Sequence, residues 1–255
     1  MQRQPVRNVD ETGWREKRKR RWLWLSATPL VIIFRLLTTR GAAGAKALLG
    51  GDVWGSIGTD RDAGYNWIDP RQRQLCWAHL KRELIAWSER AGETARIGLA
   101  LLTVENQLFA LWYRVRDGTL PWAEFQVAML PLMHRVGTLL REGATGTEPK
   151  TQRTCRNLLQ REAALWTFVW ESEVEPTNNR AERSLRRAVL WRRRSFGTQS
   201  TAGSQFVERI LTAVTTLRQQ RRDVLDYLTA ACTAAIRSEP APSLLPLTSP
   251  PLSAW

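Results

Sequence analysis

The chain has 255 residues, 43% of them hydrophobic, which is enough for one large domain or for one domain with a sizeable insertion. Its 38 lysines and arginines outnumber 24 acidic residues, and the formal charge of +14 favours a polyanionic partner, most often nucleic acid. Three widely spaced cysteines argue against a disulfide framework or zinc finger, and no segment resembles a membrane span or signal peptide, so we expect a cytoplasmic protein without a membrane partner.

The first sixty residues have the pattern of strands. Two apolar runs separated by Thr28 and Pro29 predict a hairpin, because proline is harmless at a turn or a strand start. The charged run 15–21 predicts the turn from an earlier strand. We expect strands over 6–14, 22–27, 30–37 and 53–60, and a short helix over 41–50 that is stopped by glycine.

From Trp77 the apolar period becomes that of helices, with stripes around 101–115 and 125–139 and a further helix over 151–170. Three more helical patterns follow Pro176, and the last eighteen residues are rich in proline and serine. The chain therefore divides into residues 1–76 and 176–237 as an α/β core, 77–175 as a helical insertion, and 238–255 as a disordered tail. The tryptophans at 77, 87, 112 and 122 are expected in the core rather than as platforms on which bases stack.

Three carboxylates occupy places suited to chemistry. Asp10 lies in the first strand, Asp60 ends the fourth, and Glu182 lies in the first turn of a helix. Clustered carboxylates repel one another, and divalent cations are the usual reason for them to persist. The alternatives are structural, since aspartates at strand ends commonly form turns, and Glu182 would occupy a capping-box position if Asn179 is the N-cap.

Ordered motifs give this pattern a family resemblance. "VDETGWR", "SIGTDRDAGYNW", "RQLCWAHLKREL" and "EPTNNRAERSLRRAVLWRRRSFGTQSTAGSQFVERILT" resemble the catalytic region of bacterial DDE transposases of the insertion-sequence-66 family. The resemblance runs from about Val9 to Ala235. It implies an RNase H-like mixed sheet flanked by helices, with a long helical insertion before the last acid.

The resemblance also implies function. Asp10, Asp60 and Glu182 correspond to the ligands of two divalent ions, with Mg²⁺ expected and Mn²⁺ as the alternative. The implied reaction nicks DNA at the ends of the element and joins the 3′-hydroxyl to a target. Asp62 stands where relatives carry an aromatic residue, so its role is open, and Asp52 and Asp69 do not match the pattern.

The positive charge around Glu182 predicts DNA contacts. Seven arginines lie between Arg180 and Arg194, and Arg183 and Arg187 are four apart on one helix face. His79 forms a C-x-x-H pair with Cys76; two ligands do not make a structural zinc site, so a structural or DNA-positioning role is favoured. The predicted DNA-binding residues are His79, Arg180, Arg183, Arg187, Arg192, Arg193 and Arg194.

Relatives carry end-binding and oligomerisation elements before the first aspartate, whereas nine residues precede Asp10 here, so a truncated catalytic portion is expected. A transposase acting on element ends and target DNA would be a homo-oligomer in its active complex and associated with the nucleoid. Two alternatives remain open: a non-catalytic DNA-binding remnant, and an RNase H-like nuclease that cuts without joining.

Overall fold

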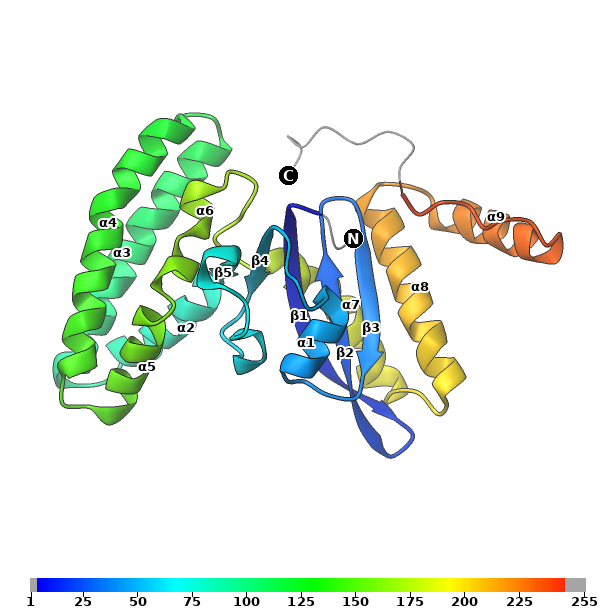
Figure 1. Cartoon of the computed structure of the whole chain (residues 1–255), viewed down its shortest axis with the longest axis horizontal. Helices are drawn as coiled ribbons and strands as arrows, with labels where there is room; N and C mark the ends of the chain where they lie inside the picture. Colours follow the sequence, from blue (N-terminus) through cyan, green and yellow to red (C-terminus); the bar gives the residue numbers. More distant parts are fainter. Residues whose placement is uncertain (1–3, 246–255) are drawn as a thin grey trace. The chain divides into compact units, whose positions relative to one another are not determined.

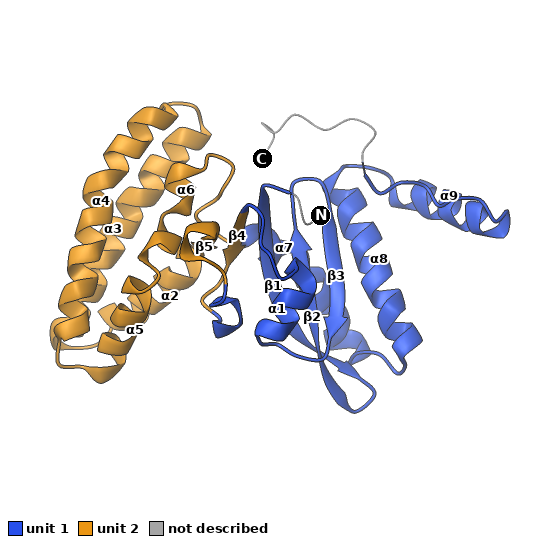
Figure 2. Cartoon of the chain, in the orientation of Figure 1, with its two compact units in different colours: residues 1–55, 62–67, 179–255 blue, residues 56–61, 68–178 orange. Residues whose placement is uncertain are grey.

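The computed structural model describes residues 4–245. Within that range the chain is mixed α/β, with nine α-helices and five strands that form both antiparallel and parallel pairs. It divides into two compact units, shown in different colours in Figure 2. Unit 1 comprises 1–55, 62–67 and 179–255, and unit 2 comprises 56–61 and 68–178.

Unit 1 is built on an antiparallel meander of three strands. The strands are β1 (Val6–Glu16), β2 (Lys19–Ala27) and β3 (Ile32–Leu37). In their register Asp10 lies opposite Leu25, and Leu25 lies opposite Phe34. The predicted hairpin break is confirmed, because the Thr28 hydroxyl accepts hydrogen bonds from the amides of Leu30 and Val31 and so closes the turn.

The two faces of this meander bury different helices. One face packs on α7 (Asn179–Ser195) and α8 (Thr201–Gln219), and its apolar core unites residues from three strands and both helices. The other face carries Trp24, which contacts α1 (Ala42–Leu49) at Gly44 and donates its indole N–H to Thr39. Figure 1 shows α1 on the near side of these strands. The core residues of the first face are Trp14, Leu23, Leu25, Ala27, Ile32, Phe34, Ala181, Leu185, Ala188, Val207 and Leu211.

Unit 2 is mainly a helical bundle attached to a short parallel strand pair. Its elements are β4 (Ser56–Thr59), η2 (Pro70–Gln72), β5 (Arg73–Leu75), α2 (Trp77–Ser88), α3 (Gly92–Arg116), α4 (Trp122–Thr145), α5 (Pro149–Leu159), η3 (Glu162–Leu165) and α6 (Thr167–Trp170). Aromatic side chains dominate its core, where Trp112 contacts Phe125 and Phe168. The tryptophans at 77, 87 and 112 are buried as expected, and Trp122 is half-buried against Phe125.

The single helix expected over 151–170 is wrong. The chain breaks after Leu159 into η3 and α6, because the segment that follows is buried and takes hydrogen bonds from outside itself. The amide of Phe168 donates to the side chain of Gln74, and the Thr167 hydroxyl donates to the carbonyl of Arg73. These contacts with β5, a strand that the sequence pattern did not predict, satisfy the polar groups that a continuous helix would have satisfied internally.

The described range ends with α9 (Val224–Ile236) and irregular backbone up to residue 245. Arg222 donates to the carbonyls of Ser243 and Leu244, and Tyr227 donates to that of Pro242, so this part of the predicted tail lies against the α8–α9 connection. The remainder of that predicted tail, 246–255, lies outside the described residues. None of the helices in the described range is long and apolar enough to cross a bilayer.

Candidate active site

Asp10 lies on the face of β1 that packs against α7. Side chains alternate along a strand, so Asp10, Thr12 and Trp14 share one face. Trp14 belongs to the core that includes Ala181 and Leu185, which fixes that face as the α7 side. One carboxylate oxygen of Asp10 accepts the amide N–H of Glu11 at 2.8 Å, and the side chain is half-buried.

Glu11 points to the opposite face and has a structural role that the sequence analysis missed. Its side chain is 1% exposed, accepts a hydrogen bond from Arg40 at 2.8 Å and is bonded by the Tyr65 hydroxyl. The second guanidinium nitrogen of Arg40 pairs with Asp62 at 3.1 Å, while Asp62 also accepts the amide of Gly64. Asp62, whose role the sequence left open, caps the short helix η1 (Ala63–Tyr65) and pairs with Arg40. Of two adjacent acids in "DETGW", Glu11 is committed to this network.

Glu182 is the fourth residue of α7, because the helix begins at Asn179. The capping-box alternative required Asn179 to be the N-cap, and the observed start moves Glu182 one position beyond the N3 site of that motif. Ala181, Leu185 and Ala188 form the buried stripe of α7, and the half-buried Glu182 flanks it.

The hydrogen bonds of Arg192 set the register between α7 and β1. Arg192 donates to Thr12 Oγ1 at 2.8 Å and to the carbonyl of Gly13, and farther on Thr198 donates to the carbonyl of Arg15 at 2.9 Å. The helix therefore runs alongside β1 in the same direction. Glu182 precedes Arg192 by ten residues (192 − 182), or about 15 Å of helix. That length spans roughly four or five residues of a strand. Counted back from Thr12 and Gly13, it brings Glu182 level with residues 7–9 of β1, which immediately precede Asp10.

Asp60 belongs to unit 2 and directly follows β4, which confirms its predicted place at a strand end. A buried arginine, Arg73, fixes the backbone there. Its guanidinium donates to Thr59 Oγ1 and to the carbonyl of Asp60, both at 2.8 Å. Arg73 was not predicted as a site residue, because it lies in the polar run "RQRQ" and nothing near it in the chain signals its burial. The Asp60 side chain is half-buried.

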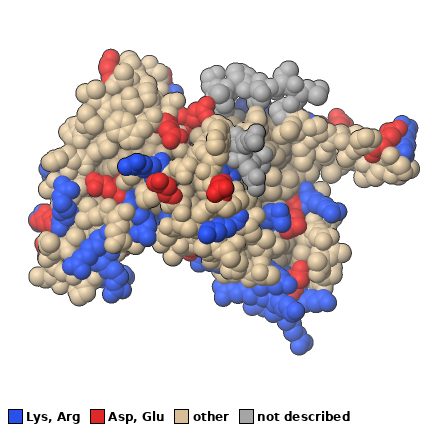
Figure 3. All heavy atoms as spheres, in the orientation of Figure 1, with Lys and Arg blue, Asp and Glu red and all other residues tan. Residues whose placement is uncertain are grey.

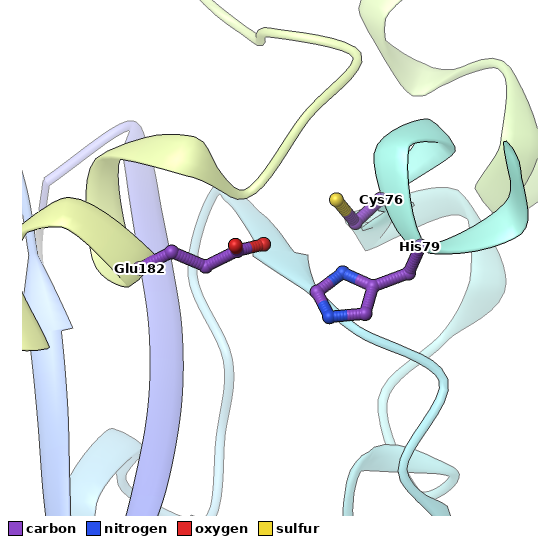
Figure 4. Close-up of side chains that lie close together, drawn as sticks. All are labelled: Cys76, His79 and Glu182. Atoms are coloured by element: carbon purple, nitrogen blue, oxygen red, sulfur yellow. The ribbon is translucent and has the colours of Figure 1, made fainter. Parts of the chain in front are cut away.

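Cys76 and His79 meet at the beginning of α2. Cys76 is buried at the N-cap, His79 lies in the first turn, and their ligand atoms are within 4.8 Å of each other. The Cys76 sulfur accepts the amide N–H of Asn178 at 3.1 Å, and the amide of Trp77 donates to the carbonyl of Pro176 at 2.9 Å. Figure 4 shows these two side chains projecting from the start of α2, and that of Glu182 projecting from α7. Two ligands of this kind do not make a structural zinc site.

The comparison with protein families gives this geometry a context. A model described as the transposase IS66 family matches residues 1–206. The chain belongs to this family. Membership implies a function in DNA transposition, DNA as a partner and the activity of a DNA-processing enzyme. Neither the curated proteins nor the solved structures contain a match.

The arginines of this IS66-family transposase divide by environment. Arg183, Arg187, Arg193 and Arg194 are exposed, whereas Arg180 and Arg192 are half-buried. Partial burial and the nearby charge of Arg218 lower the pKa of Arg187. Arg192 holds α7 to β1 through the bonds described above. The exposed arginines have the accessibility that phosphate contacts require.

Proposed function

We propose that this IS66-family transposase nicks DNA and transfers strands by divalent-metal-dependent phosphoryl transfer, with Asp10, Asp60 and Glu182 as catalytic metal ligands. The observation that carries the proposal is the placement of Asp10 and Glu182 in unit 1. Asp10 lies on the α7 face of β1, and Glu182 lies on α7 level with the strand residues that immediately precede Asp10.

The donor set fits hard divalent cations. All three side chains offer carboxylate oxygens, the ligand type that Mg²⁺ and Mn²⁺ prefer. Two such ions, when bound, supply the positive charge that activates the attacking oxygen and stabilises the leaving oxygen. The carboxylate-rich set contrasts with the Cys76–His79 pair, whose soft thiolate suits other metals.

The residues around the acids would orient them. The amide of Glu11 restrains the Asp10 carboxylate, and Arg73 restrains the backbone at Asp60. We infer that Arg180, Arg183, Arg187, Arg193 and Arg194 contact DNA phosphates, with Arg192 contributing where its remaining donors are accessible and His79 positioning the strand.

The wider architecture belongs to the same proposal. Residues 1–76 and 176–237 would form an RNase H-like core, interrupted by the helical insertion 77–175. The active complex would be a homo-oligomer acting in the cytoplasm on the nucleoid, since two element ends and a target must be held together.

The test is a nicking and joining assay on DNA that carries the element ends, with Mg²⁺ or Mn²⁺. Asp10→Asn, Asp60→Asn and Glu182→Gln should each abolish metal-dependent nicking while DNA binding persists. Asp52→Asn, which alters an exposed aspartate outside the motifs, is the matched control and should retain activity.

Two outcomes would contradict the proposal. If the protein binds DNA but produces no metal-dependent nick, it is a DNA-binding remnant. If it nicks DNA but gives no strand-transfer product from a pre-cut end, it is a nuclease that does not join.

A further inference from the structure

The tip of the β1–β2 hairpin carries the densest positive charge of unit 1. Every side chain of this tip except Glu16 is cationic, and those at 15 and 17–20 are exposed. Glu16 is already engaged, since it accepts from Arg21 at 3.2 Å and from Ser204 at 2.6 Å. Lysine and arginine side chains gather at this end of the unit in Figure 3. The tip residues are Arg15, Glu16, Lys17, Arg18, Lys19, Arg20 and Arg21.

Hydrogen bonds join this tip to the end of α7. The amide of Lys17 donates to the carbonyl of Thr198 at 2.7 Å, and the amide of Thr198 donates to that of Arg15 at 2.9 Å. The exposed Arg193 and Arg194 occupy the last turn of the helix. We call residues 15–21 together with 193–196 the hairpin surface.

Phe196 stands in the hairpin surface with its side chain 78% exposed. Its φ of 57° is left-handed, a conformation that bulky residues rarely adopt and that costs free energy. The neighbouring Gly197 has a φ of 111° and lies against the Arg15 backbone, with no room for a side chain. The junction thus holds a strained backbone that presents an aromatic ring to solvent among cations, and burial of the ring does not explain it.

We propose that the hairpin surface binds DNA at a distorted or unpaired step, where its cations hold backbone phosphates and Phe196 stacks on the exposed base. Cations alone would bind any phosphate backbone. An exposed aromatic ring adds affinity where a base is unstacked, because every base has a face on which it can stack. This inference rests on DNA being the partner under the proposed function and identifies a contact that is separate from the three acids.

The experiment measures binding of the full chain to two fluorescent duplexes, one fully paired and one with a single unpaired 2-aminopurine. The wild type should bind the second duplex more tightly and quench its emission by stacking. Phe196→Ala should weaken binding to the unpaired duplex by about tenfold and abolish the quenching. Tyr113→Ala, which removes an exposed aromatic ring from α3, should change neither signal.

Salt dependence separates the two kinds of contact. Arg18→Gln and Lys19→Gln should each reduce the slope of log K against log salt by about 0.9 if the residue neutralises one phosphate, whereas Phe196→Ala should leave the slope unchanged. Arg153→Gln, which removes an exposed cation of α5, should leave the slope as in the wild type.

A stability measurement excludes a merely structural role. Asparagine tolerates the left-handed conformation, so Phe196→Asn should unfold at a temperature no lower than the wild type while losing the preference for the unpaired duplex.

The inference would be overturned if the wild type bound the two duplexes equally and Phe196→Ala bound them with the same affinities as the wild type. Normal metal-dependent nicking would in that case leave the proposed function standing. A change of oligomeric state in Phe196→Ala with unchanged DNA binding would instead assign the ring to a contact between copies. Absence of binding to either duplex would overturn both proposals.

Discussion

At the scale of single residues, the alternation of side chains along β1 places the adjacent acids Asp10 and Glu11 on opposite faces of the strand, in different surroundings. Glu11 is held by Arg40 and Tyr65 on one face, whereas Asp10 lies on the face of α7. A buried carboxylate with two partners is committed to the fold, because loss of its charge leaves those partners unsatisfied.

Substitution should therefore separate the two acids in stability. Glu11→Gln should lower the free energy of unfolding by about 1–3 kcal/mol. This range is smaller than that for a fully buried ion pair, because Arg40 is partly exposed to solvent. Asp10→Asn should change it by less than about 0.5 kcal/mol. Urea unfolding of both variants measures this, and equal losses would show that Asp10 is a structural acid as well.

The cysteines should differ in reactivity. Burial, with a smaller contribution from the charge of Glu83, raises the pKa of Cys155 to about 12. Cys232 is exposed. Because the thiolate is the reactive form, an alkylating reagent at pH 8 should modify Cys232 quickly and Cys155 only after unfolding. Peptide mass mapping with time checks this, and rapid labelling of Cys155 in the native protein would contradict the packing of unit 2.

At the scale of elements, the sequence predicted the turns and helix ends that are determined by residues close together in the chain. The break at Thr28 and Pro29, the glycine stop of α1 and the start of α7 all follow from residues near each other in the chain. The split of 151–170 and the strand β5 could not be predicted, because they depend on contacts between Gln74 and Phe168, which are 94 residues apart.

The candidate site shows the same limit. Its acids stood out through motif order, but the alignment of Glu182 along β1 follows from the bond between Arg192 and Thr12, which are 180 residues apart. The supporting residues Arg73 and Tyr65 were missed for that reason, since neither carries a local signal for the partner that it binds.

The junction between the hairpin and α8 should respond to acid. The hydrogen bond from Ser204, aided by Arg21, lowers the pKa of Glu16 below its ordinary value of 4.5. A carboxylate with a lower pKa in the native state stabilises the fold at neutral pH, and this contribution is lost as the pH falls through the native pKa.

Glu16→Gln should therefore flatten the dependence of unfolding free energy on pH between about 3 and 6. Glu239→Gln, which alters an acid beyond α9, is the control. If both variants keep the wild-type slope, Glu16 does not hold the junction.

At the scale of the whole molecule, the proposed function draws on residues of both compact units. Unit 1 contributes Asp10, Glu182, the arginines of α7 and the hairpin surface, while unit 2 contributes Asp60 and a helical bundle. The formal charge of +14 favours association with DNA before any sequence is read. The central claim is that the acids of both units hold the same ions.

The most direct test is a crystal structure of the protein with Mn²⁺, read from the anomalous scattering of the metal. The account predicts one or two manganese peaks coordinated by carboxylate oxygens of Asp10, Asp60 and Glu182, and loss of those peaks in Glu182→Gln. Glu182 folded back on the Asn179 backbone, with no manganese at either aspartate, would contradict it.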